Sequence, residues 1–403
     1  MVFFKDLINI SNIFEMDETE VKEYRWEGGY EKTWEEVKED EGGNVEWSVK
    51  EIIEKSKRLL ATRQPNVRLG MMRHLFVIVD SSNSMVEKDL KPTRQLCTYK
   101  LLQDFIQDYF DQNPISQLGL ITTRNSSAER ISELSGNRKY HLEELKKTFG
   151  DFNYCNGLMS VQNSLEIALS VMKMLPSHTS KEILIIGSSL SSCDPGEINT
   201  SIEMLKTHNI RVSMIHLAAE VRMFRHLCNE TKGKHNVIVD DVHFKHILWS
   251  LVEPVPLPNS VDASCVKMGF PQELEQKPPF TTCSCHLAEG GKLNAKGFFC
   301  PQCNSKYCEL PVECKCCGLI LVSSLHLARS LHHLVPIKPF IKIELEEGSS
   351  AYCYGCRKRI KVPAENVYFC ESCKKHYCDG CDIYVHNTLH VCPGCAVKRD
   401  EKR

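Results

Sequence analysis

Cysteine is the residue type whose number and spacing most clearly predict chemistry in this chain. The 403 residues include 21 cysteines, and sixteen of these lie after position 280. Most of the sixteen form pairs with two residues between them, and such C-x-x-C pairs are typical ligands of zinc. Paired thiols of this kind favour a metal-binding protein of an intracellular compartment over a disulfide-bonded secreted protein.

The first group of pairs predicts a four-cysteine zinc finger. The pairs Cys300-Pro-Gln-Cys303 and Cys314-Lys-Cys-Cys317 are ten residues apart. Tetrahedral zinc needs four soft ligands, and two tight turns supply them at a small cost in chain entropy. We prefer Cys317 to Cys316 as the fourth ligand, because only Cys317 completes a C-x-x-C pair. Four cysteines offer substitutes: Cys283, Cys285, Cys308 and Cys316. We expect Cys308 to be a buried thiol.

The second group of pairs predicts two interleaved zinc sites near the C-terminus. Its pairs are Cys353/Cys356, Cys370/Cys373, Cys378/Cys381 and Cys392/Cys395, separated by 13, 4 and 10 residues. The four-residue gap is too short for separate fingers that close one after another. We therefore predict that the first and third pairs bind one ion and the second and fourth bind another, as in a RING-type domain. Three histidines could also bind zinc: His376, His386 and His390. Because eight cysteines already fill two sites, we expect these histidines to be structural or exposed.

The residues before the cysteine-rich part predict the elements of a larger domain. The uninterrupted apolar run 75–79 ends at Asp80 and is typical of a buried strand in a parallel sheet. Further strands are predicted at 117–123, 182–187, 211–217 and 235–240. Helices are predicted from about position 92 and over 142–149, 161–174, 197–208, 222–232 and 241–251. This alternation predicts an α/β fold, a doubly wound and mainly parallel sheet with helices on both faces.

Composition divides the chain into five expected parts. They are an acidic and aromatic N-terminal arm (1–50), an α/β domain (51–252), a Pro-rich linker (253–282), a C4 zinc finger with a helix predicted over 319–334 (283–335) and a C4C4 RING-type domain (336–403). Within the first two parts, 48–64 is predicted to be an amphipathic helix. The arm is either a solvated tail or a segment that orders on a partner. The small zinc-binding parts have too little chain for a conventional core.

The loop after the first predicted strand carries a second pattern. Asp80, Ser82 and Ser84 form an Asp-x-Ser-x-Ser triplet, which resembles the cation-binding motif of von Willebrand factor A domains. That family also uses a Thr from a second loop and an Asp after the third strand. Here the corresponding positions offer Ser160 and Ser188, although Asp194 could partly compensate. Because Mg²⁺ prefers carboxylate help, we expect Asp80 and its serines to shape the loop without holding a cation.

Charge and motifs argue against several classes of function. The formal net charge is −2, and the lysines of the zinc-binding part form no basic stripe, so we expect no direct, sequence-specific nucleic-acid binding. No apolar run is long enough to span a membrane. The sequence has no P-loop, H-E-x-x-H or G-x-S-x-G motif, and we predict that the protein is not an enzyme. The alternative is a RING-type ubiquitin ligase, although Tyr354 and Ala396 depart from the pattern of active RING domains.

The order of these modules resembles one protein family. An A-type domain, a C4 finger and an all-cysteine RING, together with strings such as Met268-Gly-Phe-Pro271 and Cys308-Glu-Leu-Pro-Val-Glu-Cys314, resemble the A-domain/RING subunits of TFIIH, the general transcription and DNA-repair factor. The resemblance implies a nuclear, non-catalytic core subunit that carries three zinc ions. It further implies that the A-type domain binds and stimulates the XPD-type helicase in nucleotide excision repair and RNA polymerase II transcription initiation. The zinc modules would hold the companion A-domain subunit, beside other core subunits.

Overall fold

The computed structural model describes most of the chain after position 69. The described residues are 70–150, 154–256, 265–271, 281–285, 293–294, 297–334, 337–338, 340–343, 351–360, 367–389 and 391–400. The N-terminal arm and the helix expected over 48–64 lie outside them.

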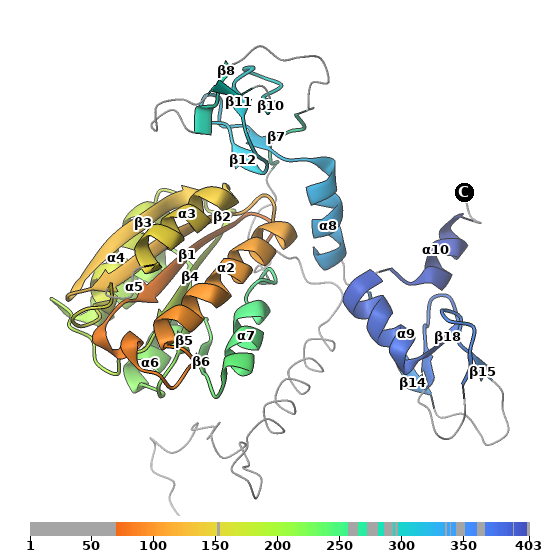
Figure 1. The fold of residues 1–403 in the computed structure, drawn as a ribbon, viewed down its shortest axis with the longest axis horizontal. Coiled ribbons are helices and arrows are strands. Elements are labelled where there is room, and N and C mark those ends of the chain that lie inside the picture. The colour runs from red at the N-terminus through yellow and green to blue at the C-terminus, as the bar shows by residue number, and fades with distance from the viewer. Residues whose placement is uncertain are drawn as a thin grey trace, which may run out of the picture. The chain divides into compact units, whose positions relative to one another are not determined.

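The larger part of the described chain is a domain built on a six-stranded sheet (Figure 1). Its strands are β1 (Arg73–Asp80), β2 (Gln117–Arg124), β3 (Ser127–Ser135), β4 (Ser180–Gly187), β5 (Ile210–His216) and β6 (His235–Val237), in the order β3-β2-β1-β4-β5-β6. All neighbouring pairs are parallel except β2 and β3. The predicted α/β fold with a mainly parallel sheet is therefore confirmed. The strand order reverses between β1 and β4, where such sheets usually place their binding sites.

Helices cover both faces of this sheet and enclose two cores. The helices are α2 (Arg94–Gln112), α3 (Arg138–Phe149), α4 (Val161–Met172), α5 (Ile198–Thr207), α6 (Arg222–Glu230) and α7 (Asp241–Ser250). Along β1, Leu75, Val77 and Val79 pack with residues of α2, α3 and α7. Phe76 and Ile78 point to the opposite face and pack with residues of α4, α5 and α6. Successive side chains of β1 point alternately into the two cores, so all eight of its residues are buried.

Strand β3 was absent from the sequence prediction. It pairs antiparallel with β2 at the edge of the sheet, after a two-residue turn at Asn125 and Ser126 with φ of 50° and 58°. Positive φ at both positions matches the tight turn that suits the twist of a hairpin. Only Ser132 of its nine residues is buried, and the strand has no apolar run in its sequence.

A buried ion pair links strands β1 and β4. The Nε and Nη2 atoms of Arg73 donate to the two carboxylate oxygens of Glu182 at 3.0 and 2.7 Å. Arg73 also donates to the carbonyls of Leu251 and Val252, just after α7, at 2.9 and 2.6 Å. The Arg73 guanidinium further lies over the Tyr109 ring at 5.1 Å. This one side chain thus joins two strands, helix α2 and the end of the A-type domain.

Short strands and helices make up the cysteine-rich part. The strands are β7 (Met268–Gly269), β8 (Thr281–Thr282), β9 (Leu293–Asn294), β10 (Phe298–Phe299), β11 (Lys306–Tyr307), β12 (Val312–Glu313), β13 (Ile320–Leu321), β14 (Ile341–Ile343), β15 (Ala351–Tyr352), β16 (Arg359–Ile360), β17 (Val367–Phe369) and β18 (His376–Cys378). The helices are α8 (Ser324–Leu334), α9 (Asp379–Tyr384), a π-helical turn η3 (Val385–Leu389) and α10 (Pro393–Asp400).

Two details of this part differ from the sequence prediction. Strand β7 lies in the segment expected to be a linker, and it pairs in parallel with β13. Helix α8 begins at Ser324, and not at position 319 as its apolar residues suggested. Ile320 and Leu321 pair instead with β12 in an antiparallel ladder, which gives their backbone groups partners within the finger.

Candidate metal centres and the loop behind the first strand

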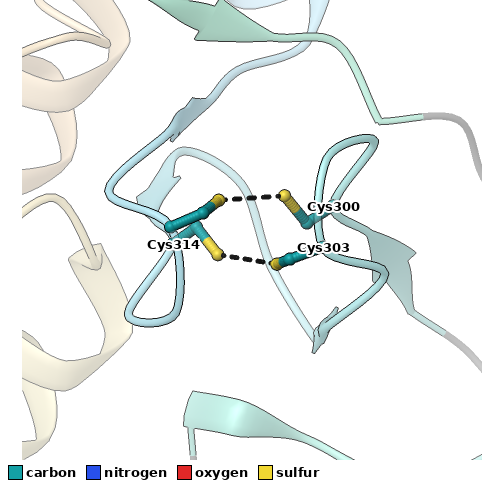
Figure 2. Close-up of side chains that lie close together, drawn as sticks. Cys300, Cys303 and Cys314 are labelled. Atoms are coloured by element: carbon teal, nitrogen blue, oxygen red, sulfur yellow. Dashed lines mark hydrogen bonds between the residues drawn. The ribbon is translucent and has the colours of Figure 1, made fainter.

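The four cysteines predicted for the finger lie together. The sulfur atoms of Cys300, Cys303, Cys314 and Cys317 all lie within 4.8 Å of one another. Figure 2 shows the thiols of Cys300, Cys303 and Cys314 directed into one common space between two turns. Cys316 is exposed and lies outside this set. The structure therefore brings together the set that the spacing favoured, with Cys317 in place of Cys316.

Each turn of the finger has the same local geometry. The Cys300 amide donates a hydrogen bond to Ser305 O at 3.0 Å, and the Asn304 amide donates one to Cys300 O at 2.9 Å. Asn304 has a φ of 56°, and Gly318 occupies the equivalent place after Cys317 with a φ of 68°. Asparagine and glycine are the residues that adopt this left-handed conformation most readily. Each turn thus points its two thiols to the same side.

The eight C-terminal cysteines form two interleaved sets. One set contains Cys353, Cys356, Cys378 and Cys381, and the other contains Cys370, Cys373, Cys392 and Cys395. Within each set the sulfur atoms again lie within 4.8 Å of one another. This grouping joins the first pair with the third and the second with the fourth, as the short gap between the middle pairs predicted.

The distances between sulfur atoms test whether zinc fits these sets. Four thiolates about 2.3 Å from a tetrahedral ion lie about 3.8 Å from one another. The Cys356–Cys378, Cys370–Cys395 and Cys373–Cys392 distances are 3.8, 3.6 and 3.7 Å. In the finger, the Cys300–Cys317 and Cys303–Cys314 distances are 3.6 and 3.4 Å. A disulfide would need about 2.05 Å, so all three sets fit a tetrahedral ion and not a covalent bridge.

Two buried tyrosines support equivalent cysteines of different sets. The Tyr307 hydroxyl donates to Cys314 Sγ at 3.3 Å and accepts from the Lys315 amide at 2.8 Å. The Tyr377 hydroxyl lies 3.2 Å from Cys392 Sγ and accepts from the Gly394 amide at 3.3 Å. Each tyrosine follows the second cysteine of a turn by four residues. Sequence reasoning missed this role, although the repeated spacing is visible in the printed sequence.

Hydrogen bonds and burial shift the pKa values of the finger thiols in opposite directions. Burial alone would raise the pKa of Cys314, but hydrogen bonds from the Ser305 and Tyr307 hydroxyls outweigh it and lower that pKa to about 5. Burial and the neighbouring thiols raise the pKa of Cys317 to about 12. A bound cation removes this conflict, because it favours the thiolate form of every ligand at once.

The histidines of the C-terminal part have other contacts. His386 Nδ1 lies 3.0 Å from Asp382 Oδ1, and its ring packs edge-on against Phe340. The hydrogen bond to the Asp382 side chain raises the pKa of His386 to about 9, against the effect of burial. His376 packs against Phe369 in the β17–β18 pair. His386 and His376 thus lie outside the sulfur sets, and His390 lies outside the described residues.

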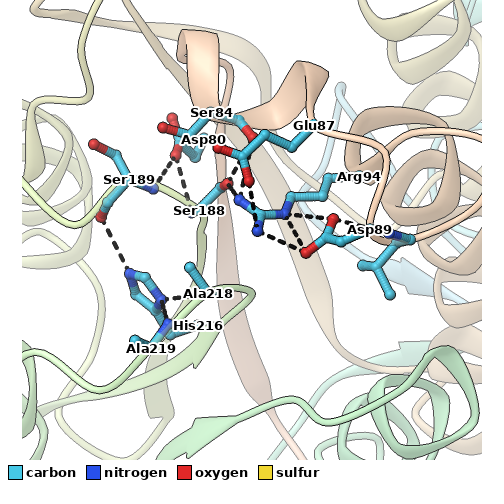
Figure 3. A network of polar contacts seen from close by, with 11 residues as sticks. Asp80, Ser84, Glu87, Asp89, Arg94, Ser188, Ser189, His216, Ala218 and Ala219 are labelled. Atoms are coloured by element: carbon cyan, nitrogen blue, oxygen red, sulfur yellow. Dashed lines mark hydrogen bonds and ion pairs between the residues drawn. The ribbon is translucent and has the colours of Figure 1, made fainter.

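The loop after β1 is organised around the buried Asp80 carboxylate (Figure 3). One oxygen accepts from the Ser82 amide at 2.8 Å. The other accepts from the Ser82 hydroxyl and from the Ser188 and Ser189 amides, each at 3.0 Å. These bonds join the ends of β1 and β4 and confirm that Asp80 shapes the loop.

Arg94 is a member of this loop network that sequence reasoning missed. Its Nη1 donates to Ser188 Oγ at 2.8 Å and to Ser84 O at 3.3 Å (Figure 3). The same guanidinium pairs with Asp89 Oδ2 at 2.6 Å and Glu87 Oε2 at 2.8 Å. A fixed positive charge beside two serines of the proposed cation site opposes divalent binding there.

The other residues that stand where von Willebrand factor A domains bind their cation have separate roles. Asp194 Oδ1 accepts from the Gln162 amide at 2.8 Å and from Ser160 Oγ at 3.2 Å. It therefore caps the first turn of α4 from a neighbouring loop. His216 Nε2 donates to Ser189 O at 3.1 Å, because its Nδ1 accepts from the Ala218 and Ala219 amides; this ring therefore links the loop after β4 to the end of β5.

Adding Mg²⁺ is expected to leave the thermal unfolding midpoint of the sheet unchanged. The Asp80 oxygens already accept four hydrogen bonds, and Arg94 supplies positive charge, so a cation gains little there. The measurement is thermal unfolding of the full chain in a Mg²⁺ titration without chelator. A midpoint that rises and then saturates with Mg²⁺ would show a cation site and contradict this expectation.

Comparison with known proteins places these features in one family. Residues 78–271 match the family described as Ssl1-like, and residues 352–397 match the TFIIH C1-like domain. General transcription factor IIH subunit 2 of Dictyostelium discoideum is 40% identical over 95% of this chain and 83% of its own length. The general transcription and DNA repair factor IIH subunit ssl1 of Schizosaccharomyces pombe is 38% identical, over 92% of this chain and 90% of its own length.

Solved structures with similar folds include the SpRpn10 VWA domain. It is 16% identical, with a TM-score of 0.37, and the match covers 48% of this chain and 99% of that one. The described sheet, with its parallel strands and helices on both faces, is von Willebrand factor A-like, and it is followed by cysteine clusters of zinc-binding type. Given relatives of 40% and 38% identity over more than nine-tenths of its length, the chain belongs to the family of general transcription factor IIH subunit 2.

Proposed function

We propose that this chain is a non-catalytic core subunit of TFIIH that acts in the nucleus as a scaffold and as an activator of the XPD-type helicase. It would serve in nucleotide excision repair and in RNA polymerase II transcription initiation. The observation that carries this proposal is the 40% identity to a TFIIH subunit 2 across 95% of the chain. The expected division into arm, A-type domain, linker, finger and RING-type domain forms part of the same proposal.

Three zinc ions would hold the cysteine-rich part together. Their ligands would be the finger set and the two interleaved sets described above, twelve cysteines in three sets of four. Bound zinc supplies folding energy to segments that have only small apolar cores of their own. Four thiolates leave each of these three ions without an open position for a substrate, which supports a structural role.

An exposed apolar surface on the A-type domain supports helicase binding. We call Val86, Leu158 and Leu190 the apolar loop surface; these side chains are 49%, 48% and 59% exposed. Their three loops are joined, since the Asn83 amide donates to Gly157 O at 3.0 Å and the Cys193 amide donates to Met159 O at 2.8 Å. The surface lies at the carboxyl ends of the parallel strands, where the strand order reverses between β1 and β4, which is the usual binding edge of such folds. Large apolar side chains are commonly the anchors of protein interfaces.

The C-terminal domain also carries large exposed apolar side chains. Tyr352, Ile383 and Tyr384 are 62%, 51% and 56% exposed although they belong to a small domain. Exposed aromatic residues are enriched at protein interfaces. These residues support the proposal that the zinc modules hold the companion A-domain subunit of TFIIH.

Adding the full chain to a purified XPD-type helicase is expected to raise its rate of DNA unwinding. Binding that favours the active helicase conformation is typically worth about 1–3 kcal/mol, or roughly 5- to 150-fold in the underlying equilibrium. The Leu190→Asp variant should weaken the interaction about tenfold or more, because it places a charge in the apolar loop surface. The measurement is unwinding rate against subunit concentration.

A matched control separates this surface from apolar exposure in general. Met174 is 79% exposed and lies between α4 and β4, at the opposite end of the sheet from the apolar loop surface. The Met174→Asp variant should therefore stimulate the helicase as the wild type does. An unwinding rate that does not change at saturating wild-type subunit would remove the proposed activator function.

A further inference from the structure

Three more cysteines of the finger region lie together outside the twelve. The sulfur atoms of Cys283, Cys285 and Cys308 all lie within 4.8 Å of one another. Cys283 is buried, and the other two side chains are partly buried. The expectation that Cys308 is a buried thiol is wrong, because its side chain is only partly buried and two other cysteines lie beside it.

Backbone structure brings these three thiols together. Cys283 directly follows β8, and the Cys285 amide donates to Cys283 Sγ at 3.3 Å in the turn that begins there. Cys308 directly follows β11, whose pairing with β10 fixes it within the finger. Cys285 also packs against the apolar cluster that contains Cys300, Tyr307 and Cys314. The three thiols thus come from two strand ends that meet beside the finger.

We propose that Cys283, Cys285 and Cys308 form a fourth zinc site. Three thiolates are soft ligands with high affinity for zinc, and the partial exposure of Cys285 and Cys308 leaves one position of the tetrahedron for a water molecule or another donor. A disulfide accounts for the arrangement less well, because it would use two of the three thiols and leave the third beside them. The ion would fasten the segment after β8 to the finger.

Native mass spectrometry of the zinc-replete full chain tests this site. The wild type should carry four zinc ions. Each of the single variants Cys283→Ser, Cys285→Ser and Cys308→Ser should carry three, because two thiolates bind zinc much more weakly than three. The Cys316→Ser variant should keep four, since Cys316 is an exposed finger cysteine outside every set.

Cobalt substitution gives a second measurement that does not depend on a variant. Three sets of four thiolates and one set of three should give charge-transfer absorption from fifteen ligands, whereas three filled sets would give that of twelve. A wild-type chain that carries only three zinc ions would overturn the proposal. A disulfide between two of these three cysteines would also overturn it, and so would a three-cysteine site that binds copper but not zinc. A wild type with three ions would leave the helicase function untouched, so the two proposals fail separately.

Discussion

Replacing Cys373 by serine is expected to unfold the C-terminal zinc domain in the otherwise intact chain. Cys373 is buried, and its sulfur lies 3.7 Å from that of Cys392 in the second interleaved set. Structural zinc contributes an apparent ~10–16 kcal/mol to small domains, which exceeds or matches the whole stability of most domains. Strand β18 ends at Cys378, a member of the other set, so loss of one ion should loosen the second site as well.

Hydrogen exchange measured by mass spectrometry checks this expectation. In the Cys373→Ser variant, amides of β17, β18 and α9 should exchange at the rate of an unfolded chain, while those of β1 and β4 keep their protection. The Cys316→Ser variant serves as the control, because its thiol is exposed and lies outside the sets. Native protection of β17 and β18 in the Cys373→Ser variant would contradict the structural role of zinc.

Replacing Arg73 by methionine is expected to destabilise the A-type domain by about 3–5 kcal/mol. The change leaves the Glu182 carboxylate buried without its cation and removes the donor to Val252 O at 2.6 Å. In a domain of this size such a loss lowers the unfolding midpoint by roughly 6–20 °C. Pulsed hydrogen exchange of β1 and β4 during a urea titration gives the change in free energy of unfolding.

Two control variants separate the charge effect from side-chain packing. Replacing both partners, in Arg73→Met/Glu182→Leu, should recover much of the loss, because no charge then remains buried. Arg130→Met breaks the exposed pair with Glu133 and should change stability by at most about 1 kcal/mol. If Arg73→Met changed stability no more than Arg130→Met, the buried pair would not hold the domain together.

The same ion pair predicts how the stability of the A-type domain depends on pH. Burial would raise the pKa of Glu182, but Arg73 outweighs this and holds that pKa below its ordinary value. The carboxylate therefore contributes stability that is present above the ordinary glutamate pKa of about 4.3 and is lost as the pH falls through the folded-state value. The Arg73→Met/Glu182→Leu variant should lack this part of the acid destabilisation.

The cysteine sets were predictable because their geometry is local. A C-x-x-C turn positions two ligands through its own backbone, and the four-residue gap between Cys373 and Cys378 leaves only the interleaved pairing. The buried strands β1 and β4 were equally visible, since each contains an uninterrupted apolar run. In these cases neighbouring residues carry all the information that the prediction needs.

Features that depend on distant residues were not predictable in this way. Arg73 and Glu182 form an ion pair although they are 109 positions apart in the sequence. Sequence alone gives no sign that either charged residue is buried. Cys308 joins two cysteines that precede it by more than twenty positions, with no motif to link them. Strand β3 is polar because it lies at an exposed edge, so only its hairpin turn could have revealed it.

The central proposal is that thiolate-bound zinc, more than the small apolar cores, holds the cysteine-rich part in the shape that other subunits would bind. Its most direct test is hydrogen exchange of the full chain before and after a chelator removes all zinc, with metal loss confirmed by native mass spectrometry. We expect β10 to β13 and β15 to β18 to lose their protection together with the metal, while β1, β4 and β5 remain protected. Native protection throughout the cysteine-rich part of a zinc-free chain would contradict the claim.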